Sequence, residues 1–325
     1  MRSRSLVLLL ALAQVLGVHA CAPASADARA IVGDPADVRP SAQPGLVLMG
    51  GGPDVDEAFR WMLERSGFGD VVVLRASGGD GYNDYLAGLG PVDSVETIVT
   101  RTRAQADAAA PVVRRAEAIV IAGGDQAEYL RLWRGTELER AIRERARSVP
   151  VGGTSAGLAI LGDVVFSAER GTVYSGEALR DPFNRYMTFE RDFLDLEPLA
   201  GGITDSHFRE RNRMGRLVSF LARMTKGRWV RGAWGVGIDE ATALLVEPDG
   251  TVELVGEGSA FVLRPSRRPA LCRAGEPLTM RGVRVWRLDE GDRFDLATWR
   301  GVGVVRFRIS AIEGRLRSST GRIYG

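Results

Sequence analysis

The chain has 325 residues, of which 45% are hydrophobic and 26% charged, and its formal net charge is +2. That length suits one large or two small domains. The balanced charge and the lack of a zinc-knuckle, helix-turn-helix or RNA-binding motif give no argument for nucleic acid. The two cysteines are Cys21 and Cys272, so a lipid on Cys21 would exclude a disulfide within the chain. So few cysteines and histidines do not suit a zinc site, and we expect neither a metal nor another cofactor.

The first 20 residues have the pattern of an export signal. Two arginines precede the apolar run 5–15, which is too short to span a bilayer, and small residues follow it. Their removal leaves 41 basic and 41 acidic residues, so the mature chain is nearly neutral. We therefore expect a secreted or periplasmic protein. Residues 18–21 also form an imperfect lipoprotein signal, so a lipid anchor on Cys21 is an open alternative to a soluble form.

Residues 21–43 are rich in Ala, Asp and Pro and predict a flexible lead-in. From residue 44 to 245, apolar runs alternate with helical patterns, which predicts an α/β domain with a largely parallel sheet flanked by helices. The expected strands are 46–49, 71–74, 94–99, 118–121 and 149–151. The expected helices are 55–66, part of 101–115, 127–147 and a helix that begins at 156. Most of these strands run into glycine-rich turns, and ligand sites form at that edge of an open parallel sheet.

Beyond residue 245 the pattern changes to short apolar runs separated by Pro-Asp-Gly, Gly-Glu-Gly and Asp-Glu-Gly. This pattern is typical of β-hairpins, so residues 246–325 predict a β-rich C-terminal extension and not a second catalytic unit. No internal repeat is present. The sequence does not decide between a monomer and a homodimer.

Ser155 is a candidate nucleophile, because it lies between a short strand and a helix in the segment 153–157, Gly-Thr-Ser-Ala-Gly. Glycines two residues to either side permit the sharp turn of a nucleophile elbow, in which the serine backbone is strained. The N–H of Ala156, first in the following helix, would face a developing oxyanion. The alternative is an ordinary glycine-rich turn in which Ser155 caps the helix.

A second glycine-rich turn, Gly-Gly-Asp-Gln at 123–126, also ends a strand and begins a helix. Glycine lets a backbone N–H approach a substrate carbonyl closely, so Gly124 is a candidate second oxyanion donor. Gln126 is a candidate for binding a substrate amide. The alternative is a plain helix start with Asp125 as its N-cap.

His207 is the one histidine outside the export signal and is therefore the candidate base. Four arginines follow it between residues 209 and 216, at the start of a predicted helix. Cations there oppose the helix dipole, so we expect a bound negative group, and guanidinium binds carboxylate in a bidentate manner. The alternative is a solvated basic face.

A base of this kind needs an acid to orient it. The segment 234–242 predicts a strand that ends in two adjacent carboxylates, and of these we favour Glu240. Three alternatives stay open: Asp239, Glu169 and Glu177.

Together these segments resemble peptidase family S51, and their order and spacing are closer to the cyanophycinases than to the aspartyl dipeptidases. The resemblance covers about residues 45–265 and rests on the segments 123–126, 153–157, 205–208 with the arginines after it, and 238–242. It implies a class-I glutamine-amidotransferase-like α/β fold with Ser155 as nucleophile, His207 as base and Glu240 as acid. It also implies a substrate pocket made by Gln126, Asp205, Arg211, Arg213 and Arg216.

The chain departs from the cyanophycinases at Ser206, where they carry glutamine. A serine reaches less far, so this position bears on specificity for the β-aspartyl-arginine polymer. We expect an exported serine hydrolase that cleaves peptide or isopeptide bonds at aspartyl residues, with this polymer as the leading substrate. Two alternatives are an α-aspartyl or isoaspartyl dipeptidase and a catalytically silent carboxylate-binding module. A glutamine amidotransferase is disfavoured, because that chemistry uses cysteine at the elbow.

Overall fold

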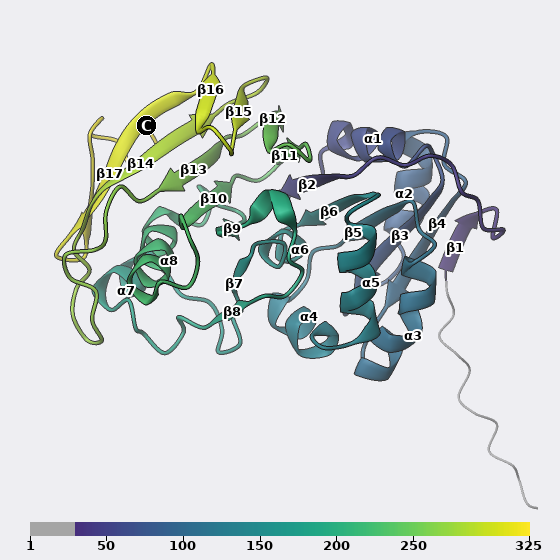
Figure 1. The fold of residues 1–325 in the computed structure, drawn as a ribbon, viewed down its shortest axis with the longest axis horizontal. Helices are drawn as coiled ribbons and strands as arrows, with labels where there is room; N and C mark the ends of the chain where they lie inside the picture. Colours follow the sequence, from purple (N-terminus) through teal and green to yellow (C-terminus); the bar gives the residue numbers. More distant parts are fainter. Residues whose placement is uncertain (1–29) are drawn as a thin grey trace, which may run out of the picture.

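A computed structural model describes residues 30–325 and shows two β-sheets that meet near the middle of the molecule (Figure 1). The expected export signal and Cys21 lie outside the described residues. Within the described chain, none of the helices combines the length and apolar character needed to cross a membrane.

The first sheet has ten strands in the order β1-β4-β3-β5-β6-β2-β11-β12-β15-β16. Its central five strands are parallel, as the sequence predicts: β4 (Ser94–Val99), β3 (Asp70–Arg75), β5 (Ala118–Ile121), β6 (Pro150–Thr154) and β2 (Gly45–Met49). The remaining strands pair antiparallel at the two sides: β1 (Ala30–Gly33), β11 (Thr242–Val246), β12 (Thr251–Gly256), β15 (Arg293–Asp295) and β16 (Arg300–Val302). The expectation of a flexible lead-in is wrong for residues 30–33, because they pair with β4 as an edge strand.

Helices cover both faces of this sheet, which explains why β2, β3 and β5 contain continuous apolar runs. Val71 and Val73 of β3 pack in the core beneath α1 (Asp56–Arg65) and α2 (Tyr82–Leu89). Val72 and Leu74 face the opposite core, which is covered by α3 (Arg103–Val113), α4 (Gln126–Trp133) and α5 (Glu137–Arg145). The helix expected over 127–147 is two helices, because the chain turns at Gly135, whose φ is +72°.

The second sheet has eight strands in the order β18-β17-β14-β13-β10-β9-β7-β8. Its N-terminal members are β7 (Val164–Phe166), β8 (Phe189–Arg191), β9 (Gly202–Asp205) and β10 (Trp234–Ile238). The chain continues it with β13 (Ala260–Arg264), β14 (Met280–Leu288), β17 (Val305–Ile312) and β18 (Arg315–Ser318). α7 (Ser175–Arg180) and α8 (Met214–Gly227) pack on it around a core that includes Phe220, Phe261 and Ile309.

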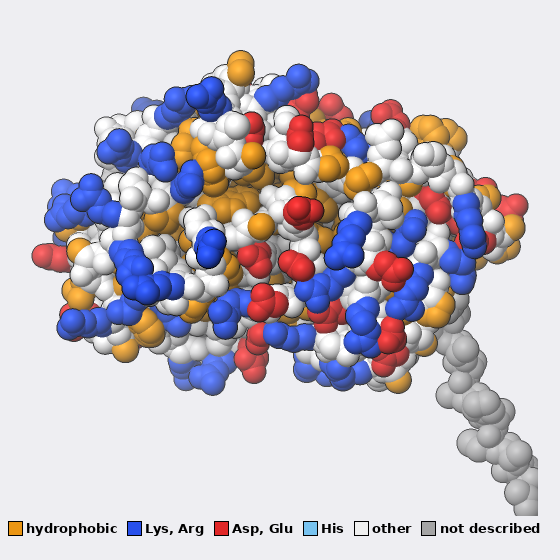
Figure 2. Space-filling model, viewed as in Figure 1, with side chains coloured by type: hydrophobic (Ala, Val, Ile, Leu, Met, Phe, Trp, Pro, Cys, Tyr) orange, Lys and Arg blue, Asp and Glu red, His pale blue; other side chains and the backbone are white. Residues whose placement is uncertain are grey.

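Strands beyond residue 246 therefore join both sheets, and the helix-poor character expected for residues 246–325 is confirmed within the described chain. The boundary at 245/246 stays a prediction. Residues 260–325 contain 14 arginines against six acidic residues. Figure 2 shows the consequence, with arginine side chains dominating the surface over the C-terminal strands and acidic side chains more frequent over the other half.

Two backbone hydrogen bonds hold Ser155 and His207 against the end of β2, the first within the ten-stranded sheet and the second between the two sheets. The N–H of Ser155, after β6, donates to Met49 O of β2 at 3.1 Å, and the N–H of His207, after β9, donates to Gly50 O at 2.8 Å. The short helix α6 (Ala156–Ala159) lies at this junction in the middle of Figure 1. The fold therefore brings the candidate nucleophile and the candidate base together from different sheets.

Candidate active site

Ser155 has the backbone of a strained elbow, with φ +53° and ψ −110°. A Cβ added to Gly153 would lie 2.5 Å from the carbonyl carbon of Gly157, and one added to Gly157 would lie 2.1 Å from Ile121 O. Neither position can hold a side chain, so the tight turn between β6 and α6 requires both glycines. The predicted elbow geometry is confirmed.

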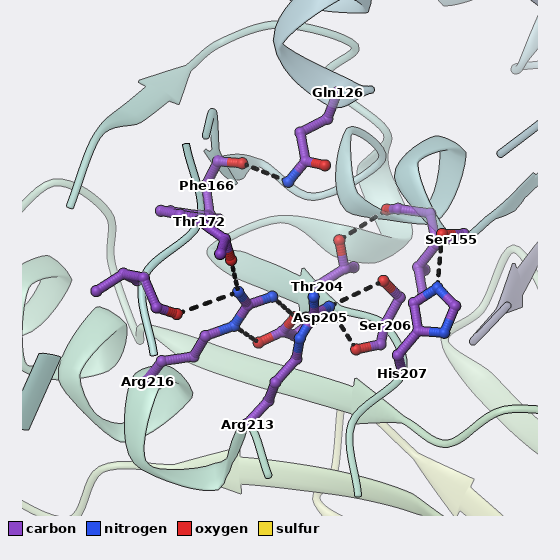
Figure 3. A network of polar contacts seen from close by, with 12 residues as sticks. Gln126, Ser155, Phe166, Thr172, Thr204, Asp205, Ser206, His207, Arg213 and Arg216 are labelled. Carbon is purple, nitrogen blue, oxygen red and sulfur yellow. Dashed lines mark hydrogen bonds and ion pairs between the residues drawn. The ribbon is translucent and has the colours of Figure 1, made fainter. Parts of the chain in front are cut away.

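A continuous relay of side chains begins at Ser155. Its Oγ lies 2.8 Å from Nε2 of His207 (Figure 3), and Nδ1 of His207 lies 2.5 Å from Oε1 of Glu240. A carboxylate beside Nδ1 places the proton on that nitrogen, which leaves Nε2 free to accept the hydroxyl proton of Ser155. The arrangement matches the nucleophile–base–acid order of a serine hydrolase.

Two of the alternative acids, Asp239 and Glu177, have other partners. Asp239 is almost fully buried and accepts hydrogen bonds from the N–H groups of Arg209, at 2.9 Å, and Ser259, at 3.1 Å. Burial raises the pKa of Asp239 to about 6, although the nearby Arg209 guanidinium opposes that rise. Glu177 accepts from the N–H of Tyr174 at the start of α7. Of the candidate acids, Glu240 is the one in contact with His207.

His207 is itself largely buried, and its environment favours the neutral imidazole. Burial is the main cause that lowers its pKa below the usual value, and the positive charges of Arg211 and Arg213 act in the same direction. The Glu240 carboxylate opposes this shift through its hydrogen bond. A neutral base is therefore maintained to lower pH than in a free histidine.

The glycine turn after β2 also belongs to the site, although its residues were not among the predicted site residues. A Cβ on Gly51, whose φ is +92°, would lie 2.6 Å from Cε1 of His207 and 3.0 Å from Cβ of Ser155. A Cβ on Gly52 would lie 2.8 Å from Cβ of Glu240. The sequence signal for this turn is three consecutive glycines directly after a buried strand. The neighbouring sequence does not indicate that the turn contacts Ser155, His207 and Glu240, which lie more than 100 residues later.

The predicted oxyanion donors belong to two segments next to Ser155. Ala156 follows it at the start of α6, which has only four residues, so the N–H itself and not a long helix dipole is available to an oxyanion. The turn containing Gly124 is next to the nucleophile, since a Cβ on Gly123 would lie 3.6 Å from Cβ of Ser155. Tyr129 holds this turn by donating its hydroxyl to Ala122 O, at 2.8 Å, and Gly123 O, at 3.1 Å.

A cavity of about 710 Å³ brings together most of the predicted substrate residues. Gln126 contributes to its lining and donates its side-chain amide to Phe166 O at 3.2 Å (Figure 3). The loop 168–175 lines the cavity together with Gly124, Asp125, Arg211, Arg213 and Arg216. Asp125 also caps α4 by accepting from the N–H of Ala127, so the alternative interpretation of that residue is confirmed.

Two of these arginines have a negative partner inside the protein. Arg216 forms a bidentate pair with the buried carboxylate of Asp205, with Nε–Oδ2 at 2.8 Å, and Arg213 contacts the same carboxylate at 3.2 Å. Arg216 also donates to Thr172 Oγ1, as Figure 3 shows. Asp205 thus supplies the negative charge that was expected from a bound ligand at this helix start.

Arg211 differs from its neighbours. It is exposed, lines the cavity, and its guanidinium has no hydrogen-bond or ion-pair partner among residues 30–325. Arg213 is mostly buried, and this burial lowers its pKa to about 10 despite the opposing charge of Asp205, so it is still a cation at neutral pH. The cavity therefore offers an anionic ligand two cations: Arg211, which has no negative partner in the described chain, and Arg213, which shares the Asp205 carboxylate with Arg216.

No group of three or more His, Cys, Asp or Glu side chains suited to a metal forms anywhere in the described chain.

Comparisons with known proteins show the family of the chain. Residues 83–254 match the model of peptidase family S51. A cyanophycinase from Trichormus variabilis is 32% identical over 212 residues, which cover 63% of this chain and 66% of that protein. A cyanophycinase from Synechococcus elongatus is 31% identical over 226 residues, covering 67% and 65%. The match thus spans slightly less than two thirds of these relatives' lengths.

The fold also resembles a solved structure, the crystal structure of a peptidase from an acI-B1 actinobacterium. The TM-score is 0.53 with 17% sequence identity, and the similarity covers 79% of this chain and 98% of that one. At 17% identity, this similarity is evidence for the fold alone.

Proposed function

Because the chain belongs to peptidase family S51, we propose that it is a serine peptidase that cleaves peptide or isopeptide bonds at aspartyl residues. The observation that carries this proposal is the unbroken line of contacts from Ser155 Oγ through His207 to Glu240. A relay of this kind has little purpose in a binding module, which disfavours the silent alternative.

In the proposed reaction, Nε2 of His207 takes the hydroxyl proton of Ser155 while Oγ attacks the scissile carbonyl carbon. The N–H groups of Ala156 and Gly124 bind the resulting oxyanion, and Glu240 stabilises the imidazolium. His207 then gives its proton to the leaving amine, and the C–N bond breaks. Water, deprotonated by the same histidine, hydrolyses the acyl-serine and restores the free hydroxyl.

The substrate we propose is cyanophycin, the β-aspartyl-arginine polymer. The relatives named cyanophycinase support it. So does the cavity lined by Gly124, Arg211 and Arg213, in which the two arginines are available to a substrate carboxylate and the glycine turn lies next to Ser155. Ser206, the position that departs from glutamine, is buried, and its carbonyl and hydroxyl oxygens both accept from Arg213. We propose that Asp205 acts through Arg213 and Arg216 and not by contacting the substrate.

We also propose that the enzyme acts outside the cytoplasm, in secreted, periplasmic or lipid-anchored form. The support is the sequence pattern of the first 21 residues. Such an enzyme would degrade polymer released by other cells, since a storage polymer made within the same cell requires a cytoplasmic enzyme.

The test is to incubate wild-type protein and Ser155→Ala with insoluble β-Asp-Arg polymer, with β-aspartyl dipeptides and with α-aspartyl dipeptides. We expect wild type to release β-Asp-Arg from the polymer and Ser155→Ala to release none. Cleavage of dipeptides alone would favour the dipeptidase alternative. Binding of aspartyl compounds without cleavage of any would favour the carboxylate-binding module.

A further inference from the structure

The segment after β18 packs against the loop 207–213, which begins at the candidate base. Tyr324, the penultimate residue, packs its ring edge-on against Phe208, with centroids 6.0 Å apart, and against Phe261 of β13, at 5.4 Å. Phe208 directly follows the candidate base His207. Tyr324 lies well beyond residue 254, where the family match ends, so it belongs to a part of the chain that the match does not describe.

The Tyr324 hydroxyl connects two parts of the site's scaffold. It donates to Oδ1 of Asn212 at 3.0 Å and accepts a longer contact from the N–H of Met214, the first residue of α8, at 3.4 Å. Burial raises the pKa of Tyr324 to about 12, so the hydroxyl keeps its proton and can donate across the physiological range.

The loop that Tyr324 contacts has an uncommon backbone. His207 has φ +44° and Asn212 has φ +48°, and non-glycine residues in this left-handed region persist only where surrounding contacts hold them. Asn212 is held from two sides, since its carbonyl oxygen accepts from Ser175 Oγ and its side chain accepts from Tyr324. Its immediate neighbours along the chain are Arg211 and Arg213, two of the three arginines that line the cavity.

We infer that Tyr324 is a positioning residue, which fixes the loop 207–213 so that Arg211 and Arg213 face the substrate carboxylate. This inference rests on the proposed function, because it assigns a purpose to the cavity that Arg211 and Arg213 line. It also gives the C-terminal region a part in substrate binding, through Tyr324, which follows the last strand, β18. The proton relay is held separately, by Gly50, Glu240 and Ser155, and does not depend on the tyrosine hydroxyl.

The test is Tyr324→Phe, which keeps the ring contacts and removes the hydroxyl. We expect KM for the aspartyl substrate to rise about three- to tenfold, the usual effect of losing one or two neutral hydrogen bonds. Turnover should stay within about a factor of two, and the pH profile should be unchanged. The matched control is Tyr85→Phe, which removes a hydroxyl that donates to Asp56 at 2.6 Å on the α1–α2 side, and it should leave KM unchanged.

A merely structural role would give a different pattern, with a lower melting temperature and fewer active molecules but the same KM. Asn212→Gly provides the reciprocal variant, because glycine tolerates the left-handed backbone and lacks the acceptor. If Tyr324 and Asn212 act through one contact, the double variant should be no worse than the poorer single variant. Equal KM in wild type and Tyr324→Phe, or fully additive effects, would overturn the inference.

A second readout separates failure of this inference from failure of the proposed function. Two serine-reactive phosphonates are compared, one neutral and one carrying a carboxylate. In Tyr324→Phe the rate of labelling by the carboxylate probe should fall relative to the neutral probe, and in Tyr85→Phe the ratio should not change. An unchanged ratio overturns the positioning role alone, whereas absence of labelling in wild type overturns both.

Discussion

At the scale of single residues, three neighbouring arginines have three different environments. Arg216 is buried against Asp205, Arg213 shares that carboxylate, and Arg211 has no partner among the described side chains. The sequence alone does not distinguish the three arginines, because their environments depend on which guanidinium reaches Asp205 in the folded chain. Replacing each arginine should therefore have a distinct effect.

Arg211→Met should move the acidic limb of the pH–rate profile to higher pH. His207 must be neutral to act as a base, and its lowered pKa places the wild-type limb below about 6.5, so activity is lost as pH falls through that range. The Arg211 charge disfavours the imidazolium, and its removal raises the histidine pKa. The measurement is kcat/KM between pH 5 and 8, with the exposed Arg101→Met as control. A limb that does not move would contradict the assignment of His207 as base or the influence of Arg211.

Arg216→Met should destabilise the fold as well as reduce activity. It removes the bidentate partner of a buried carboxylate, and breaking such a pair typically costs about 3–5 kcal/mol. Denaturant unfolding measures the loss, and Arg211→Met, at an exposed position, should show little change. Arg216→Lys should recover only part of the stability, since an ammonium cannot form both hydrogen bonds. Equal unfolding midpoints for wild type and Arg216→Met would show that the pair contributes nothing.

At the scale of elements, the turn Gly50–Gly52 is as much a part of the site as the elbow is. We expect Gly51→Ala to lower kcat by at least about tenfold, because the new Cβ would lie 2.6 Å from the imidazole and the φ of +92° strains any side chain. Folding should be largely retained, because the atoms that the new Cβ would meet belong to His207 and Ser155 and not to an apolar core cluster. Turnover and the unfolding midpoint are measured together.

The matched control is Gly79→Ala, at a loop position where the added Cβ meets nothing within 4 Å. This variant should be as active as wild type. If Gly51→Ala were as active as wild type, the turn would not constrain His207 and would not be part of the active site.

Elements with a strong local pattern were predictable from sequence, and those defined by distant partners were not. Of the five parallel strands, β2, β3 and β5 were recognised because burial on both faces makes them continuous apolar runs. α2 was missed because it is short and contains glycine, and β7, β8 and β9 were missed because three or four residues give no period. Ser155, His207 and Glu240 were found from motifs, whereas Gly51 and Tyr324 reach the site only through the fold.

At the scale of the whole molecule, the strands after residue 259 are part of the core and not an appendage. They supply Phe261, Leu263, Val285, Phe307 and Ile309 to the apolar cluster around α8. Each such side chain contributes roughly 1.5–3 kcal/mol on burial, so together they rival the 5–15 kcal/mol total stability of a typical domain.

A chain ending at residue 259 should consequently fail to fold cooperatively. We expect a loss of the near-ultraviolet circular dichroism signal and of a sharp thermal transition, together with binding of an apolar dye. Full-length protein is the control. A soluble, cooperatively folded and active truncated chain would show that residues 260–325 form an independent unit.

The most direct test of the central claim is the reaction of Ser155 with a fluorophosphonate, followed by mass spectrometry of the modified protein. We expect one adduct, on Ser155, with labelling much slower in His207→Ala and absent in Ser155→Ala. Hydrolysis by Ser155→Ala should fall by a factor on the order of 10⁶ while its unfolding curve stays that of wild type. An adduct on another residue, or more than a few per cent of activity remaining in Ser155→Ala, would contradict the assignment of Ser155 as nucleophile.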